Sequence, residues 1–99
     1  MLTHKDITRS IEEHAEQVVA YGVKKIGIFG SFAGRRHSNK SDIDILVEFR
    51  KDGKAFDNYM GLKFYLERLF HRRIDLVIKE ALKPRIKRLI LREARYARL

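Results

Sequence analysis

The 99-residue sequence contains no cysteine, which excludes disulfides and thiolate metal sites. It has no apolar run near the roughly 20 residues that span a bilayer, and its first residues lack the hydrophobic stretch of a secretory signal. Low-complexity segments, internal repeats and Pro/Gly/Ser-rich linkers are also missing. These absences predict one domain over residues 1–99, located in the cytoplasm and not associated with a membrane.

Acidic residues are in short supply: 13 Asp and Glu stand against 22 Lys and Arg, a formal net charge of +9. Such a chain attracts polyanions, which include nucleotides, nucleic acids and acidic proteins. The excess is largest from Lys83 onward, where seven basic residues accompany the single acid Glu93. This basic segment fits an acidic partner, nucleic acid or a merely solvated face, and its sequence does not choose among them.

Hydrophobic periodicity predicts three helices and three strands. The helices are expected over residues 6–21, over residues 55–70 and from Pro84 onward, and the strands over residues 24–30, 41–49 and 72–78. The resulting α-β-β-α-β-α order predicts an α+β fold, with helices packed on a small mixed β-sheet. The expected buried residues of the second helix are Phe56, Tyr59, Leu62, Leu66, Leu69 and Phe70. Those of the last helix are Ile86, Leu89, Ile90, Ala94 and Ala97.

Three aspartates stand in predicted strands, where aspartate is depleted. Asp42 and Asp44 are two residues apart, which places their side chains on one face of the strand, roughly 7 Å apart. Asp75 repeats that setting in the next strand, and if the strands are neighbours the three carboxylates converge. A divalent cation would relieve their repulsion, and oxygen ligands suit Mg²⁺. The alternatives are polar residues on a solvent-facing sheet, or salt bridges to Arg35, Arg36 or Arg73.

The dipeptide Gly30-Ser31 follows the first predicted strand. Glycine there lets backbone amides approach a phosphate, and a helix starting just after it would add its own N–H groups. The motifs GxxxxGK[ST] and GxGxxG are both absent, so a purely structural turn is the more frequent explanation. The histidines share no metal-ligand spacing and are expected on the surface or in loops; they are His4, His14, His37 and His71.

Taken together, residues 26–49, IGIFGSFAGRRHSNKSDIDILVEF, resemble the signature of the polymerase-beta-like nucleotidyltransferases. That signature is a hydrophobic residue, Gly, and Gly or Ser, a spacer of about ten residues, and Asp-hydrophobic-Asp on a strand. The family's third carboxylate is matched by Asp75, between Ile74 and Leu76. The stretch ALKP at residues 81–84 is similar to the compact members called minimal nucleotidyltransferases. The resemblance extends from the first strand to the last helix.

The resemblance implies a division of labour. Asp42, Asp44 and Asp75 would be the catalytic residues and the ligands of two Mg²⁺ ions, with Asp75 also helping to deprotonate the attacking hydroxyl. Gly30 and Ser31 would hold the β- and γ-phosphates of ATP. Many relatives have Arg directly after this Ser, where the present chain has Phe32. The cations in the following loop are candidates for neutralising the triphosphate, although a solvated basic loop explains them equally well; they are Arg35, Arg36 and Lys40.

Minimal nucleotidyltransferases often act as antitoxins beside a HEPN-domain ribonuclease toxin and add AMP to a tyrosine of that toxin. The resemblance therefore implies ATP as substrate, a HEPN toxin as partner and AMP transfer as the reaction. Two other functions remain open: a non-catalytic antitoxin that blocks its partner by occlusion, and a basic nucleic-acid-binding domain. A homo-oligomer is also compatible with the sequence.

Overall fold

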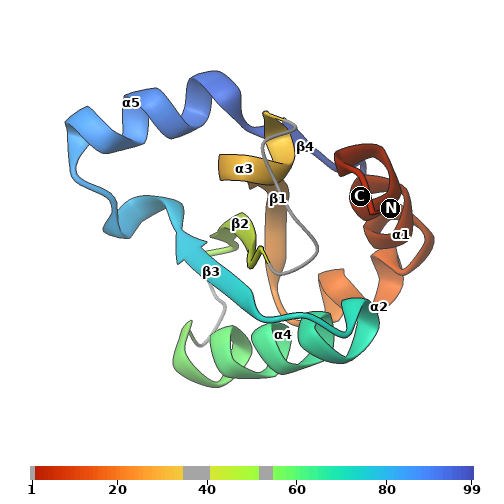
Figure 1. The fold of residues 1–99 in the computed structure, drawn as a ribbon. Helices are drawn as coiled ribbons and strands as arrows, with labels where there is room; N and C mark the ends of the chain where they lie inside the picture. The colour runs from red at the N-terminus through yellow and green to blue at the C-terminus, as the bar shows by residue number, and fades with distance from the viewer. Residues whose placement is uncertain (1, 35–40, 52–54) are drawn as a thin grey trace.

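The structure is a computed structural model that describes residues 2–34, 41–51 and 55–99. Its main helices and strands follow the order that the sequence predicts, and four more elements arise from the division of the first helix, α3, a 3-10 turn and β4 (Figure 1). In chain order they are α1 (His4–Glu13), α2 (Ala15–Ala20), β1 (Val23–Phe29), α3 (Gly30–Ala33), β2 (Ile43–Phe49), α4 (Ala55–Phe70), β3 (Ile74–Ile78), a 3-10 turn (Lys79–Ala81), α5 (Pro84–Glu93) and β4 (Arg95–Tyr96).

The four strands form one mixed sheet in the order β3-β2-β1-β4. Strands β1 and β2 are antiparallel, β2 and β3 are parallel, and β4 pairs antiparallel with β1. The parallel pair is connected through α4, because parallel neighbours require a crossover rather than a hairpin. The α+β class with a small mixed sheet is thereby confirmed.

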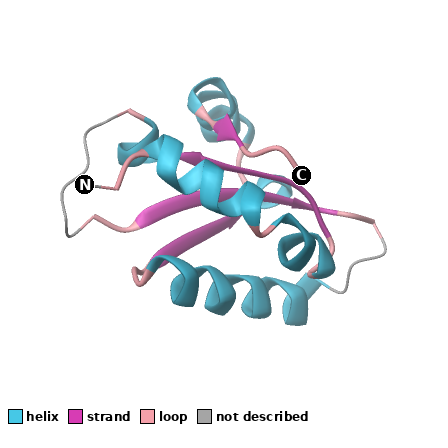
Figure 2. Cartoon of the chain, turned by 90° about the vertical axis from the view of Figure 1, so that its right-hand side faces the viewer, coloured by secondary structure: helices cyan, strands magenta, loops and turns pink. Residues whose placement is uncertain are grey.

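One face of the sheet is covered by α1, α2 and α4, as Figures 1 and 2 show from two directions. The alternating residues of β2 that point to this face, Ile43, Ile45 and Val47, are all 0% exposed, as are Leu62 and Leu66 of α4. They form a single hydrophobic cluster, which we call the closed face. Burial of a leucine or isoleucine side chain contributes about 1.5–3 kcal/mol, so this face supplies most of the stability.

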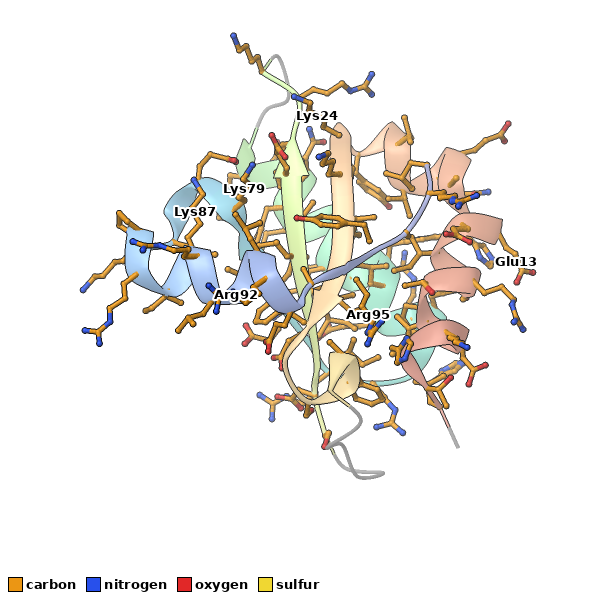
Figure 3. All side chains as sticks on the ribbon, turned by 90° about the horizontal axis from the view of Figure 1, so that it is seen from above. Glu13, Lys24, Lys79, Lys87, Arg92 and Arg95 are labelled. Carbon is orange, nitrogen blue, oxygen red and sulfur yellow. The ribbon has the colours of Figure 1, made fainter. Side chains whose placement is uncertain are left out.

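The opposite face carries Asp44, Glu48 and Asp75, and α5 lies on this side, away from α4 (Figure 1). We call it the carboxylate face. Helix α5 contains no buried residue, and Figure 3 shows Lys87 and Arg92 on this helix. Within the described residues, no helix is both long and apolar enough to cross a bilayer.

The first predicted helix is divided in two at His14, which has φ −112° and ψ 28°. Its ring Nδ1 lies 2.7 Å from the Ser10 carbonyl, a local side-chain bond that competes with a continuous helix. The helix also starts earlier than predicted, because Thr3 and Asp6 form a capping box. His4 is only 7% exposed, so its expected surface position was wrong: it lies on the inner face of α1, three residues before Ile7.

The prediction for α4 was partly wrong. Leu62 and Leu66 are fully buried as expected, and the Tyr59 hydroxyl donates to the Leu76 carbonyl at 2.6 Å. Phe56, however, is 76% exposed. At 3.6 residues per turn its side chain is rotated roughly 80° from Leu66 and 120° from Leu62, so it points away from the sheet.

The end of the chain departs most from the prediction. Helix α5 stops at Glu93, and the next residues form β4, in which Tyr96 pairs with Gly27 of β1. Ala97 is buried against the sheet rather than on a helix, and its N–H donates to the Ile26 carbonyl at 3.0 Å. The expected apolar stripe does not pack on the sheet, since Ile86 is 48% and Leu89 59% exposed. Strand pairing at the free edge of β1 outweighs the local helical pattern.

Candidate active site

Asp44 and Asp75 are directly opposite each other on neighbouring strands. The parallel register of β2 and β3 pairs these two residues, so both side chains project from the carboxylate face. Adjacent strands lie about 5 Å apart, which brings the carboxyl groups within contact range, and the two side chains share a hydrogen bond. The expected neighbourhood of the two strands is thus confirmed.

The pKa of the Asp44 carboxyl is raised from 3.8 to about 6, and burial is the largest cause. The charge of Asp75, the hydrogen bond with Asp75 and the charges of Asp42 and Glu93 contribute the rest of this increase. Asp42 itself is exposed and lies immediately before β2. The repulsion among these carboxylates favours the binding of a positive charge, either as a proton or as a cation.

The donor chemistry of this patch suits a hard cation, because it consists of carboxylate oxygens held close against their own repulsion. Among the described residues, no three Asp, Glu or His side chains already enclose a metal-sized space. The arrangement is therefore a close Asp44–Asp75 pair, with the charges of Asp42 and Glu93 nearby. Binding a divalent ion between these groups would remove the repulsion that raises the Asp44 pKa.

The Gly30-Ser31 turn lies directly against Asp44. Gly30 has φ +71°, a left-handed conformation that favours glycine, and a Cβ atom at this position would overlap the Asp44 carboxylate. Ser31, the second residue of α3, is half-buried. Phe32 is fully buried in the core, which explains why an apolar residue follows Ser31. A helix does begin at the turn, although it is only one turn long.

One residue near the site was not among the predicted site residues. Glu93, at the end of α5, accepts a hydrogen bond from the Gly30 N–H at 3.0 Å, and its charge acts on Asp44. A signal in the sequence could have indicated it, because Glu93 is the single acid in a basic segment of 17 residues, from Lys83 to Leu99. A lone carboxylate in such a segment indicates a specific partner, which here is a backbone amide 63 residues away.

Three predicted phosphate-binding cations cannot be placed, since Arg35, Arg36 and Lys40 lie outside the described residues. The salt-bridge alternative is testable only for Arg73. Within the described ranges, ion pairs join Glu48 to Lys24 at 3.8 Å and to Lys79 at 3.5 Å, and none involves Arg73. The described residues thus give no support to neutralisation of the aspartates by Arg73.

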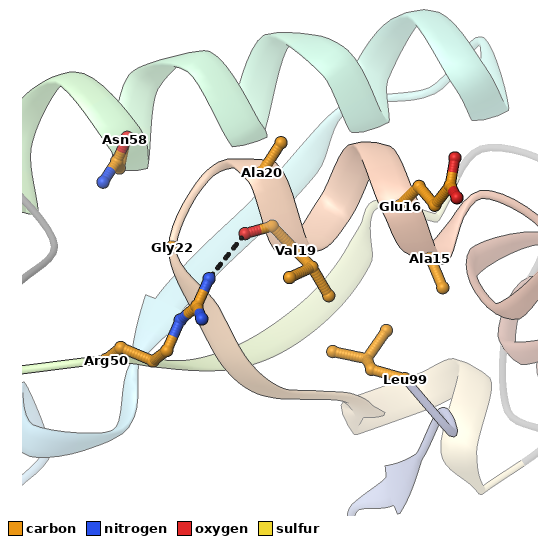
Figure 4. A pocket seen from close by; sticks show the side chains of 8 residues that line it. All are labelled: Ala15, Glu16, Val19, Ala20, Gly22, Arg50, Asn58 and Leu99. Atoms are coloured by element: carbon orange, nitrogen blue, oxygen red, sulfur yellow. Dashed lines mark hydrogen bonds between the residues drawn. The ribbon is translucent and has the colours of Figure 1, made fainter.

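A pocket of about 610 Å³ lies at the other end of the sheet, away from the aspartates (Figure 4). It is lined by residues of α2, α4 and the chain end, and Arg50 donates to the Val19 carbonyl there at 3.2 Å. None of the predicted site residues lines it. The candidate chemistry therefore belongs to the open carboxylate face and not to this pocket.

The model of the family described as "Nucleotidyltransferase domain" matches residues 10–97, which include both strands of the aspartate pair and the Gly30-Ser31 turn. The chain belongs to this family. It is a nucleotidyltransferase with the polymerase-beta-like fold, and the resemblance inferred from the sequence is confirmed.

Three known proteins are similar to this nucleotidyltransferase. The curated protein adenylyltransferase MntA of Thermococcus cleftensis is 37% identical over 97 residues, covering 97% of each chain. A solved structure described as a minimal nucleotidyltransferase has a TM-score of 0.73 and 30% identity, covering 89% of this chain and 93% of that one. An MNT antitoxin solved in complex with a tri-AMPylated HEPN toxin of Shewanella oneidensis has a TM-score of 0.62 and 17% identity, covering 90% and 70%, a likeness of fold alone.

Proposed function

We propose that this nucleotidyltransferase is a Mg²⁺-dependent protein adenylyltransferase, which transfers AMP from ATP to a tyrosine of a HEPN ribonuclease toxin and so acts as a cytoplasmic antitoxin. The observation that carries the proposal is the Asp44–Asp75 pair beside the Gly30-Ser31 turn. The protein adenylyltransferase named among the relatives supports the reaction, and the antitoxin solved with an AMPylated HEPN toxin supports the partner.

In this proposal, Asp42, Asp44 and Asp75 would hold two Mg²⁺ ions. When bound, these ions supply the positive charge that stabilises the attacking and leaving oxygens of an in-line displacement. Gly30 and Ser31, which lie against Asp44, would hold the β- and γ-phosphates. Arg35, Arg36 and Lys40 are assigned to the triphosphate from their place in the intervening loop.

The transfer exchanges one P–O bond for another. The acceptor hydroxyl oxygen forms a bond to the α-phosphorus of ATP, and the bond from that phosphorus to the bridging oxygen of the β-phosphate breaks. Pyrophosphate leaves with the electron pair, and Asp75 accepts the hydroxyl proton. Asp75 suits this role because it is exposed on the carboxylate face, where an acceptor can reach it.

The test incubates the protein with α-labelled ATP, Mg²⁺ and the product of the neighbouring gene. The wild type is compared with Asp44→Ala and with Asp57→Ala, which removes an exposed carboxylate in the first turn of α4. We expect label on the partner with the wild type and Asp57→Ala, and none with Asp44→Ala. Mass spectrometry of the labelled partner should place the AMP on a tyrosine.

Two results would contradict the proposal. If no variant labels the partner but all inhibit it, the protein is an occluding antitoxin and its aspartates are not catalytic. If the protein instead binds RNA or DNA with an affinity that falls steeply with salt and is insensitive to Asp44→Ala, the basic α5 is a nucleic-acid surface.

A further inference from the structure

The helix that carries Ser31 cannot hold its own conformation. Helix α3 has four residues, and its backbone closes with the Gly34 N–H donating to the Gly30 carbonyl at 3.2 Å. A single turn is unfavourable in isolation, because several dihedral angles are fixed for one hydrogen bond. Its position must therefore come from contacts with the rest of the molecule, one of which is the fully buried Phe32.

The last residue of α5 and the first residue of β4 contact the two ends of this turn. At the start of α3, the Glu93 carboxylate accepts the Gly30 N–H at 3.0 Å. At its end, the Arg95 guanidinium donates from Nε to the Ala33 carbonyl at 3.1 Å. Figure 3 shows Arg95 beside the sheet, where β4 runs along β1. We call this pair of residues the terminal clamp.

We propose that Glu93 and Arg95 are positioning residues, which fix the Gly30-Ser31 turn relative to Asp44 and thereby set the affinity for the nucleotide. The proposal rests on the assignment of that turn to the triphosphate. Gly30 packs so closely on the Asp44 carboxylate that no Cβ fits between them, so a shift of the turn changes the spacing between the phosphate contacts and the metal-binding aspartate. The clamp restrains this spacing from the far end of the chain.

Two variants of Glu93 separate positioning from charge. Both Glu93→Ala and Glu93→Gln remove a negative charge near the triphosphate, and charge alone predicts that both bind ATP more tightly. Only Gln retains an oxygen that can accept the Gly30 N–H. The clamp therefore predicts a Kd and a KM for ATP about 10-fold higher for Glu93→Ala than for Glu93→Gln, with kcat at saturating ATP differing less than about threefold.

A matched control comes from the same end of the chain. The Glu12 carboxylate accepts the Arg98 N–H at 2.8 Å, so Glu12→Ala also releases the terminal segment, but at α1 and not at the turn. We expect Glu12→Ala to lower the thermal midpoint as Glu93→Ala does and to leave the KM for ATP unchanged. Arg95→Met, which keeps the apolar stem, should raise that KM as Glu93→Ala does.

Amide hydrogen exchange in the nucleotide-free protein tests the clamp without reference to catalysis. The Gly30 amide should exchange at least about 10-fold faster in Glu93→Ala than in the wild type or Glu93→Gln. Equal exchange rates of the Gly30 amide in these proteins, or equal ATP affinities of the Ala and Gln variants, would overturn the inference. The proposed function would still stand in that case if the wild type transfers AMP. A wild type that binds no ATP would instead remove the proposed function, and the exchange rates would still decide whether Glu93 holds the turn.

Discussion

The two faces of the sheet are made from the same strands, yet they serve opposite purposes. On the closed face, β2 buries Ile43 and Ile45 completely against helices. On the carboxylate face, Asp44, which stands between these two isoleucines, lies opposite Asp75 and has a raised pKa. The closed face stabilises the folded state because it removes apolar surface from water. The carboxylate face destabilises it because like charges lie close together. The comparison teaches that the candidate active site lies on the face that contributes less to stability.

The largest expected effect acts on the carboxylate face alone. Asp44→Asn keeps the shape of the side chain but removes its charge, so AMP transfer should fall by about 100-fold or more, the loss usual for a group that stabilises the transition state. Steady-state labelling of the partner measures this, and circular dichroism should show an unchanged fold. Retention of more than a tenth of the activity would contradict the assignment of Asp44.

A substitution on the closed face should affect stability. Leu66→Ala should lower the free energy of unfolding by about 3 kcal/mol, because it leaves a cavity under the sheet. Leu89→Ala, on the exposed α5, is the control and should change it by less than about 0.5 kcal/mol. Urea denaturation measures both. Equal losses would mean that α5 packs as tightly as α4, contrary to the structure.

A smaller effect on stability is expected at the edge of the sheet, where β4 pairs with β1. At Gly27, a Cβ atom would lie 2.9 Å from the Arg95 carbonyl oxygen and 3.0 Å from the Tyr96 side chain. Gly27→Ala should displace β4 and cost about 1–3 kcal/mol, a typical penalty for overpacking. Amide hydrogen exchange should then become faster at Ala97, because its N–H donates a hydrogen bond to the Ile26 carbonyl. Unchanged protection at Ala97 would show that β4 accommodates the methyl group.

The smallest effect concerns pH. The pKa of Asp44 is raised from 3.8 to about 6, so between these values the folded state binds a proton more tightly than the unfolded chain does, and stability falls as pH rises. Above about pH 6, Asp44→Asn should be more stable than wild type by about 1 kcal/mol, after allowance for solvent screening at this half-buried site.

The difference in stability between Asp44→Asn and the wild type should vanish near pH 4. Urea midpoints measured in the presence of a chelator test this. Asp57→Asn serves as the control, since it removes an exposed carboxylate on α4. A wild-type advantage over Asp44→Asn above pH 6 would mean that the carboxylate pair is not strained in the metal-free protein.

Much of the fold followed from local pattern. Alternation in residues 41–49 predicted β2 and the sides to which its residues point, because side chains on a strand alternate by geometry alone. The same reasoning indicated that Asp44 and Asp75 would meet if their strands were neighbours. The break at His14 was not predictable in this way, because it involves a specific bond from the ring to the Ser10 carbonyl.

The sequence by itself determined the order of the main elements, the apolar side of β2 and β3, and which carboxylates stand in strands. These properties depend on residues close together in the chain, where backbone geometry relates them directly. Only the tertiary structure decided that residues 95–96 pair with β1, that α5 stands off the sheet, and that Glu93 reaches Gly30. Those features depend on contacts between distant residues, whose energies outweigh the local preference of each segment.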